Sequence, residues 1–383
     1  MRNFIRSIGK PNPAQQPVLP GLYHYQAPQN DPRNYRLHLR VEQDGSGVLI
    51  VNAATVLHLN QSAAQYAYDF MHNQPAETVA KAMSRRYQVS QQQVFDDYLG
   101  FANRILTLIE TPDLDPVTFL DFERRLPHTG RITAPYRLDI ALTYRLPDAN
   151  DPESAPAKRV ERELSTEEWT SVLNNAWQAG IPHVVFTGGE PTLRDDLPEL
   201  IRCAESNGQV SGLLTDGLRF ADQQYLENLL STGLDHMMIV FQAENELAWN
   251  ALDKVIAADI FVAVHLTLTE ENAADRQVLL VRLAERGVKA VSLSASQPAL
   301  SEPLSRLRDL VASYGMELVW DLPVPYSALN PVWLEVQAND PGAIGKRAVL
   351  YIEPDGDVLP TQGEQRLLGN VLHDSWETLW RQK

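Results

Sequence analysis

Hydrophobic and polar residues follow two different periods in the first third of the chain. Three short runs alternate with a period of two, which predicts strands, and three stretches with helical spacing follow them. Asn60 can cap the first of these helices, and Ser90, with Gln93 three residues later, can cap the third. The predicted strands lie at 35–39, 48–51 and 56–59, and the predicted helices at about 60–71, 76–87 and from 90 onward.

From residue 135 onward the pattern changes to strands and helices in alternation. Ser165, with Glu168 at the capping-box position, opens the first helix of this region. Such alternation is typical of parallel βα units, so the sequence predicts an α/β fold. The chain closes with a strand, an Asp355-Gly356 turn and a helix around Trp376. The strands of the alternating region are expected to begin near Arg137, Val184, Gly212, Met237, Val262, Val291 and Leu318.

These patterns divide the chain into five parts. The first part contains many Pro, Asn and Gln residues without periodicity, so we expect it to be flexible or loosely docked. The parts are a lead-in at 1–33, a small α+β domain at 34–111, a linker at 112–134, an α/β domain at 135–340 and a C-terminal segment at 341–383.

Several strands of the α/β domain carry polar residues on one face. Because side chains alternate across a strand, one face packs on helices and the other lines something polar. We interpret the region as a barrel or curved sheet whose lumen binds a ligand. The alternative is an antiparallel sheet with one solvated face. The polar residues are Asp139, Thr143, His265, Thr267, Thr269, Ser292, Ser294 and Ser296.

The residues at the carboxyl ends of the predicted strands are acidic or neutral, and none is a lysine. Ligands bind at this end of parallel sheets. These residues therefore favour a ligand with an ammonium or sulfonium charge over a phosphate-rich one. His183 and His236 precede strands, so we expect them at the opposite end of the sheet. The carboxyl-end residues are Glu190, Asp216, Gln242, Thr269, Ser296 and Asp321.

Composition limits the partners and the location of the protein. A formal net charge of −16 argues against a nucleic-acid or anionic-membrane partner, because either would need a basic surface. No apolar run approaches the ~20 residues that cross a bilayer. Residues 1–20 lack the apolar core of a secretory signal. We therefore expect a cytoplasmic protein.

The chain contains one cysteine, Cys203, within an amphipathic helical pattern. A single thiol excludes an intrachain disulfide, a cysteine-based zinc site and a cysteine-ligated cluster. We expect Cys203 to be an ordinary helix residue, and we expect no metal site.

Residues 184–194, Val-Val-Phe-Thr-Gly-Gly-Glu-Pro-Thr-Leu-Arg, form the most informative stretch of the sequence. An apolar strand ends in Gly188 and Gly189, and Glu190 and Pro191 follow, of which the proline can open a helix. The glycines permit close approach by a ligand, and the glutamate is suited to bind an amine. The alternative is a tight strand-to-helix turn.

This stretch resembles the GGEP motif of radical S-adenosylmethionine (radical SAM) enzymes, which contacts the methionyl amine of SAM in that family. Leu214-Thr215-Asp216-Gly217 resembles the family's Thr-Asn-Gly strand end, with Asp216 in place of Asn. Residues 352–360 and 368–371 resemble its C-terminal extension, called SPASM or twitch.

The resemblance covers roughly residues 135–383 and implies a partial (β/α)6-type radical SAM barrel, with SAM as a possible cofactor. His265 can contact the ligand or be a satisfied interior histidine. The implied SAM-like site comprises Gly188, Gly189, Glu190, Pro191, Asp216, Gln242, His265 and Thr269.

The chain departs from this family at the cluster-binding motif CxxxCxxC. Those three positions fall at Leu146, Asn150 and Glu153, and Thr361 stands where the extension has a cysteine. Leucine cannot replace a cluster thiolate, so we expect no iron–sulfur cluster. Gln242 ends a strand that closes with Ser-Leu-Asp in the family, which also weakens the implication that SAM binds.

Residues 34–111 resemble a winged-helix-like PqqD-like domain, a peptide-recognition element of ribosomal peptide (RiPP) maturation that is often fused to radical SAM enzymes. Recognition of this kind adds the peptide as a strand to a sheet edge. The resemblance implies a leader or precursor peptide as partner. Core packing is the alternative role for the two aromatic residues among the implied contacts, which are Val56, Leu57, His58, Leu59, Tyr98 and Phe101.

Two functions are compatible with these observations. The first is a cluster-less pseudoenzyme that binds a peptide and serves as an accessory or scaffold for a partner modification enzyme. The second is an enzyme that binds SAM or another small molecule in the barrel lumen and performs non-radical chemistry with Glu190, Asp216 and His265.

Overall fold

The computed structural model describes residues 18–28, 30–33, 35–52, 55–111, 120, 134–147, 160, 162–320, 322–325, 327–334 and 348–382. The chain divides into two compact units, residues 1–133 and 134–383. Each unit has its own hydrophobic core.

The first unit contains an antiparallel sheet in the order β1-β2-β3-β4. Three of its strands lie where the alternation predicted them, whereas β1 falls within the segment expected to be a loose lead-in. It pairs with β2 from Gly21 opposite Val41 to Gln26 opposite Arg36. Tyr23 on β1 packs against the core, so an aromatic face attaches a segment whose composition suggested disorder. The strands are β1 (Gly21–Gln26), β2 (Arg36–Val41), β3 (Gly47–Val51) and β4 (Thr55–Leu59).

Three helices follow the sheet and close this core, as the sequence predicted. The Asn60 side chain accepts a hydrogen bond from the backbone N–H of Ala63, and the Ser90 hydroxyl accepts one from Gln93. Both residues therefore satisfy backbone donors at the start of a helix. The helices are α1 (Gln61–Met71), α2 (Ala76–Tyr87) and α3 (Gln91–Glu110).

The second unit is built on a mostly parallel sheet in the order β11-β10-β9-β8-β7-β6-β5-β12-β13-β14. Strands β5 to β11 run parallel to one another, with helices between most of them, which confirms the predicted α/β fold. The seven strands are β5 (Arg137–Thr143), β6 (His183–Gly188), β7 (Val210–Thr215), β8 (His236–Val240), β9 (Phe261–Leu268), β10 (Ala290–Ala295) and β11 (Glu317–Leu318).

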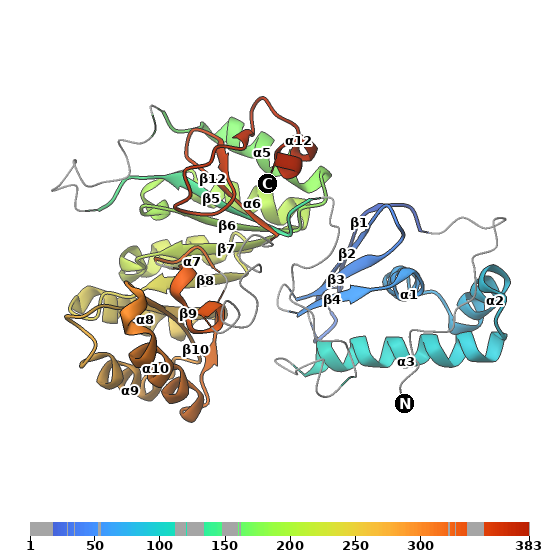
Figure 1. Cartoon of the computed structure of the whole chain (residues 1–383), viewed down its shortest axis with the longest axis horizontal. Helices are drawn as coiled ribbons and strands as arrows, with labels where there is room; N and C mark the ends of the chain where they lie inside the picture. The colour runs from blue at the N-terminus through green and yellow to red at the C-terminus, as the bar shows by residue number, and fades with distance from the viewer. Residues whose placement is uncertain are drawn as a thin grey trace. The chain divides into compact units, whose positions relative to one another are not determined.

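Helices cover the outer face of this curved sheet (Figure 1). The first begins at Ser165, where the predicted capping box forms with both of its hydrogen bonds to Glu168. The helices are α5 (Thr166–Gln178), α6 (Leu197–Asn207), α7 (Gln223–Leu230), α8 (Glu246–Ile256), α9 (Arg276–Glu285) and α10 (Ser301–Ser313), with short 3-10 turns η2 (Pro191–Leu193), η3 (Leu218–Ala221), η4 (Pro298–Leu300) and η5 (Ser327–Leu329).

The two faces of the strands differ in what they contact. On β5, Leu138, Ile140 and Leu142 belong to the large core beneath the helices. On the inner face, Val185, Met238 and other residues form a separate small apolar cluster. The period of two seen in the sequence therefore separates an outer core from a barrel interior.

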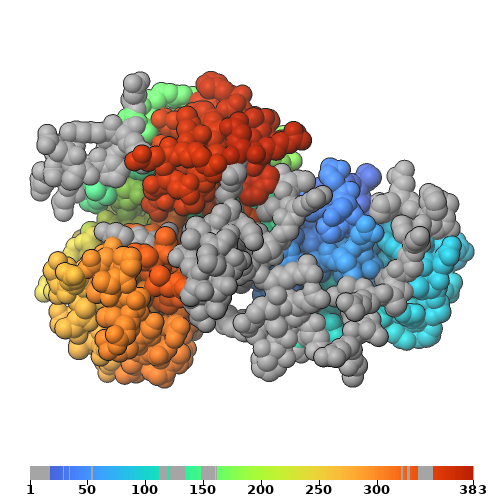
Figure 2. Space-filling model, viewed as in Figure 1, coloured from blue at the N-terminus to red at the C-terminus, as the bar shows by residue number. Residues whose placement is uncertain are grey.

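The C-terminal segment extends the sheet beyond β5. Strand β12 (Val349–Ile352) pairs in parallel with β5, and β13 (Asp357–Leu359) and β14 (Gly369–Asn370) follow as antiparallel strands before α12 (Trp376–Gln382). On the face seen in Figure 2, this segment, in red, lies beside the green first part of the barrel. Within the described ranges, no helix combines the length and apolar character that crossing a membrane requires.

Candidate functional site

A cavity of about 390 Å³ opens at the carboxyl ends of β6, β7 and β8. That volume lies in the range of small-molecule sites, roughly 300–1,000 Å³. Its lining includes five residues that the sequence analysis placed in one site, and these are Gly188, Gly189, Glu190, Asp216 and Gln242.

The two glycines of the motif allow close approach by the chain's own backbone. A Cβ on Gly188 would collide with the carbonyl oxygen of Thr143, and one on Gly189 would collide with that of Arg145. The N–H of Gly189 donates to the Thr143 carbonyl at 2.7 Å, and the N–H of Glu190 donates to the Arg145 carbonyl at 2.8 Å. The residues leaving β5 thus occupy the space that we expected a ligand to use.

The Glu190 carboxylate braces the ends of β6 and β7. Its Oε1 accepts from the backbone N–H of Thr192 at 2.9 Å and from the Thr215 hydroxyl at 2.8 Å. Its Oε2 accepts from the backbone N–H of Asp216 at 2.7 Å. The side chain is 1% exposed, so most of its hydrogen-bonding capacity serves the fold.

Burial and the negative charge of Asp216 raise the pKa of Glu190 to about 7, against the lowering effect of the hydrogen bonds from Thr192 and Asp216. Asp216 is half-buried on the cavity wall, and its Oδ1 accepts from the N–H of Leu218 at 2.9 Å. Of these two carboxyl groups, Asp216 is therefore the one that a ligand in the cavity can reach more readily.

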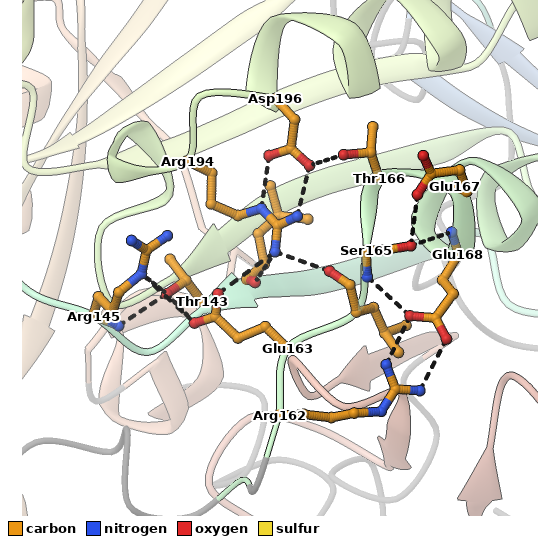
Figure 3. A network of polar contacts seen from close by, with 12 residues as sticks. Thr143, Arg145, Arg162, Glu163, Ser165, Thr166, Glu167, Glu168, Arg194 and Asp196 are labelled. Carbon is orange, nitrogen blue, oxygen red and sulfur yellow. Dashed lines mark hydrogen bonds and ion pairs between the residues drawn. The ribbon is translucent and has the colours of Figure 1, made fainter.

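The chain on both sides of residues 148–161 is tied together by charged contacts (Figure 3). Glu163, before α5, accepts a hydrogen bond from the Thr143 hydroxyl at the end of β5. Its carboxylate also lies 3.8 Å from Arg145 and 3.6 Å from Arg194. One partly exposed carboxylate thus joins the segment leaving β5, the segment entering α5 and the segment that follows the GGEP-like motif.

Arg194 anchors this network in the interior. It is 9% exposed, and it donates to the carbonyl oxygens of Leu142 and Leu164 and to both carboxylate oxygens of Asp196. Planar guanidinium groups suit such bidentate contacts. Figure 3 shows how Asp196 also accepts from the Thr166 hydroxyl in the first turn of α5. Sequence reasoning missed these roles, because nothing near these residues shows which segments meet.

The donor set near the cavity does not fit an iron–sulfur cluster. Of the three positions where a cluster loop would carry cysteines, Leu146 lines the cavity, and Asn150 and Glu153 lie outside the described residues. Cys203, the only thiol of the sequence, lies on α6, where its Sγ is 3.8 Å from Asn174 Oδ1. Clusters of this type are held by several thiolates, and one thiol on an outer helix cannot supply them.

Three predicted site residues lie outside the cavity lining. Pro191 opens the turn η2 and is buried. The backbone N–H of Thr269 donates to Asn272 Oδ1 at 2.9 Å. His265 is 1% exposed and lies in the interior. The other expected residue at the strand ends, Asp321, lies outside the described residues.

The ring nitrogens of His265 face hydroxyl groups of its own and the neighbouring strand. Nδ1 lies 3.1 Å from Ser292 Oγ, and Nε2 lies 3.2 Å from Ser294 Oγ and from Thr267 Oγ1. Burial, with a smaller contribution from Arg276, lowers the pKa of His265 to about 3. The polar face predicted on β9 and β10 therefore exists, but its groups bond to one another.

At the amino-terminal end of the sheet, the expected histidines form a pair. His183 Nε2 lies 2.9 Å from His236 Nε2, and the rings meet edge to face. Gly212 is required beside them, because a Cβ there would collide with the His236 ring. This placement is far from the carboxyl ends of the strands, as predicted.

In the described part of the chain, one group of three carboxylates could share a cation. Ligand atoms of Glu353, Asp355 and Asp357, around the β12–β13 turn, lie within 4.8 Å of one another. Tyr144 donates to Glu353 at 3.0 Å, and Asn370 donates to Asp357 at 2.9 Å. These contacts give the two carboxylates a structural role within the C-terminal segment.

The predicted peptide contacts of the first unit fall into two groups. Val56, Leu57, His58 and Leu59 belong to β4, an edge strand of the sheet. Tyr98 and Phe101 are 5% and 2% exposed and pack in the core beside Tyr66. The edge strand is the part that a partner strand can approach.

The fold is that of an α/β protein with a partial barrel of the radical SAM type. Residues 148–270 match the Radical SAM superfamily. The structure resembles crystal structures of SuiB from Streptococcus suis. For SuiB bound to S-adenosylmethionine, the TM-score is 0.58 at 13% identity, with 94% of this chain and 88% of that chain covered.

A crystal structure of SuiB that names no ligand gives a TM-score of 0.58 at 14% identity, covering 90% of this chain and 86% of that chain. The structure of SuiB bound to precursor peptide SuiA gives 0.54 at 13% identity, covering 94% and 88%. At these identities the likeness establishes the fold of the chain, and it confirms the partial barrel that the motif implied.

Anaerobic reconstitution with iron and sulfide should yield no stoichiometric four-iron chromophore, because the chain has one thiol. Iron content and the visible absorption spectrum measure this. The Cys203→Ser variant is the matched control and should give the same spectrum as the wild type. A stoichiometric chromophore on the purified wild-type chain would contradict the assignment.

Acidification should destabilise the second unit through His265. The folded state holds this histidine neutral with a pKa of about 3, whereas the unfolded chain takes up a proton near 6.5. Stability is therefore lost as pH falls below 6.5, by about 2 kcal/mol between pH 7 and pH 5 from this residue alone. Urea unfolding of His265→Asn should show a shallower pH dependence by that amount. The exposed His373→Asn variant should follow the wild-type curve, and equal slopes for all three proteins would contradict this origin.

Proposed function

We propose that this chain is a cluster-less relative of radical SAM enzymes that binds a peptide and acts as an accessory or scaffold in ribosomal peptide modification. The observation that carries the proposal is the single thiol, Cys203, which lies on α6. Without thiolates to hold a cluster, the barrel lacks the group that starts radical chemistry in the family that it resembles.

The first unit supports the peptide-binding part of the proposal. Its antiparallel sheet is followed by three helices, the order that a PqqD-like domain would have. The SuiB structure with bound precursor peptide has a similar fold over 94% of this chain, which makes a peptide the first partner to test. A leader or precursor peptide of a ribosomal product is the class that we propose.

Binding would occur by addition of a strand to β4. This strand pairs with β3 through Val56 opposite Ile50 and His58 opposite Val48, and it ends the sheet. Main-chain hydrogen bonds along such an edge give affinity, and alternate side chains give specificity. Tyr98 and Phe101 would then act from inside the core, by fixing the position of α3.

The second unit would serve as a platform for a partner modification enzyme that supplies the chemistry. Its C-terminal segment keeps the strand pairs of a SPASM- or twitch-like extension, with Thr361 where a cysteine stands in the family. Neither the segment that follows β5 nor the C-terminal segment contains a cysteine, which favours loss of cluster chemistry in the whole chain. A cytoplasmic location, as the composition suggests, fits this role.

A second candidate function rests on the cavity itself. Two carboxyl groups, Glu190 and Asp216, line a space of about 390 Å³ at the strand ends. Such lining favours a ligand with a sulfonium or ammonium charge, of which SAM is one. If SAM were bound, its charged groups would lie near Asp216, since Glu190 is 1% exposed and braces the strands. SAM would supply an electrophilic methyl group, and the residues of this chain would orient it.

Peptide binding should depend on the β4 edge. Peptides are synthesised from short open reading frames beside the gene, and at least one of them should bind the wild-type chain. Val56→Lys should weaken that binding at least about tenfold, because a lysine on an edge strand opposes strand addition. Fluorescence anisotropy measures the affinity.

Leu22→Lys is the matched control for this experiment, since Leu22 lies on β1, the opposite edge of the same sheet. This variant should bind as the wild type does. If no neighbouring peptide binds, or if both variants lose affinity equally, the β4 edge is not the recognition surface.

Binding of SAM tests the second candidate. If the cavity holds SAM, Asp216→Asn should lower the affinity about tenfold, because it removes a negative charge that faces the ligand; tenfold corresponds to about 1.4 kcal/mol. Calorimetry measures SAM binding to this variant and to two others. Asp309→Asn is the control, because it makes the same change of charge on the exposed side of α10. Glu190→Ala tests whether the buried carboxylate also contributes to binding. Absence of heat with wild-type protein would remove this function, and equal heats for wild type and Glu190→Ala would exclude Glu190 as the anchor.

A further inference from the structure

The interior of the barrel is occupied by a segment of the chain itself. After β10 and β11, the backbone N–H of Val319 donates to the Val291 carbonyl at 2.8 Å, and Leu322 and Val324 pack in the cluster on the inner face of the sheet. Val324 is 3% exposed and belongs to the same apolar cluster as Met238 on the inner face of β8.

The apolar cluster that contains Val324 is built from several strands. The inner-face cluster around Val324 draws one residue each from β6, β7, β8, β9 and β10, and Leu322 packs against it. Burying a valine side chain stabilises a fold by roughly 1.5–3 kcal/mol relative to exposing it. The cluster residues on these strands are Val185, Leu214, Met238, Ala263 and Ala290.

A hydrogen bond holds the end of the segment to the polar inner face of β10. The Ser294 hydroxyl donates to the carbonyl oxygen of Pro325 at 2.6 Å. Ser294 belongs to the group of hydroxyls around His265, which is 1% exposed. Of the polar residues that the sequence analysis assigned to a ligand, Thr267, Ser292 and Ser294 contact the His265 ring, and Ser294 also bonds to this segment.

The two prolines of the segment also form part of the wall of the cavity. Pro323 is buried and Pro325 is exposed, and both line the space that Glu190 and Asp216 line from the strand ends. Proline has no N–H and a fixed φ, so this wall offers a ligand little hydrogen bonding and little room to deform.

We propose that residues 322–325 are a built-in occupant of the barrel, which closes its interior to ligands and confines any ligand to the cavity at the strand ends. The packing of Val324 and the bond from Ser294 to Pro325 keep the segment in place. A peptide held by another part of the protein then has no route to the inner strand faces. This inference does not depend on which of the two functions is correct.

Thiol labelling tests the proposal on the full chain, because the native sequence has one cysteine to remove. In a Cys203→Ser background, Val324→Cys places a thiol within the segment. Leu367→Cys places one on the surface, since Leu367 is 55% exposed. The thiol at position 324 should react with an aromatic disulfide reagent at least about 100-fold more slowly, because it reacts only when the segment opens. Equal rates would overturn the proposal.

A second pair of variants tests the hydrogen bond. Added to Val324→Cys, Ser294→Ala should speed labelling about fivefold, as expected for loss of one internal hydrogen bond. Ser305→Ala, on the exposed side of α10, should leave the labelling rate unchanged. If Ser294→Ala does not accelerate labelling, the hydrogen bond from Ser294 to Pro325 does not hold the segment in place.

If Val324→Cys fails to fold, hydrogen exchange of the unaltered chain decides the matter. The backbone amides of Leu322 and Val324 should be protected to the same degree as those of β10. Exchange at the rate of surface loops would show that the segment leaves the interior and would overturn the proposal.

Discussion

The buried carboxylate of Glu190 is the contact on which the arrangement at the strand ends depends. It accepts hydrogen bonds from Thr192, Thr215 and the backbone of Asp216, so the end of β6, the turn η2 and the end of β7 are held as one piece. The close approach of Gly188 and Gly189 to the residues leaving β5 adds the third strand end. A buried carboxylate is tolerated only where such donors surround it. In this chain the GGEP-like motif at residues 188–191 connects the ends of neighbouring strands through hydrogen bonds.

The charged network around Glu163 and Arg194 extends these connections to the base of residues 148–161. Where a cluster would require thiolates, the described residues offer an ion pair, a hydroxyl and a leucine. Such contacts can hold a fold together, but they do not supply the several thiolates that hold a four-iron cluster. The described contacts at this end of the barrel are therefore hydrogen bonds and ion pairs between protein groups.

In the barrel interior, too, polar groups are bonded to other groups of the same chain. The hydroxyl groups of Ser292 and Ser294 lie within hydrogen-bonding distance of the His265 ring nitrogens. Val324 and Leu322 pack in the apolar part of the interior. Close packing of this kind stabilises the second unit, and the cavity beside Asp216 lies outside this packed interior, at the strand ends.

Local pattern was enough to predict most of the elements. The caps at Asn60, Ser90 and Ser165, the seven parallel strands and the group from Gly188 to Gln242 at the strand ends follow from periodicity and hydrogen bonding over a few residues. The count of one cysteine is likewise a property of the sequence alone.

Tertiary structure decided what the polar residues touch. The role of Glu190 depends on Thr215, 25 residues away, and that of His265 on Ser294, 29 residues away. β1 and the segment at 322–325 gain their positions by burying apolar side chains against distant strands. A short polar or proline-containing stretch carries no local sign of such a partner, because the free energy of its placement comes from contacts that exist only once the sheet has formed.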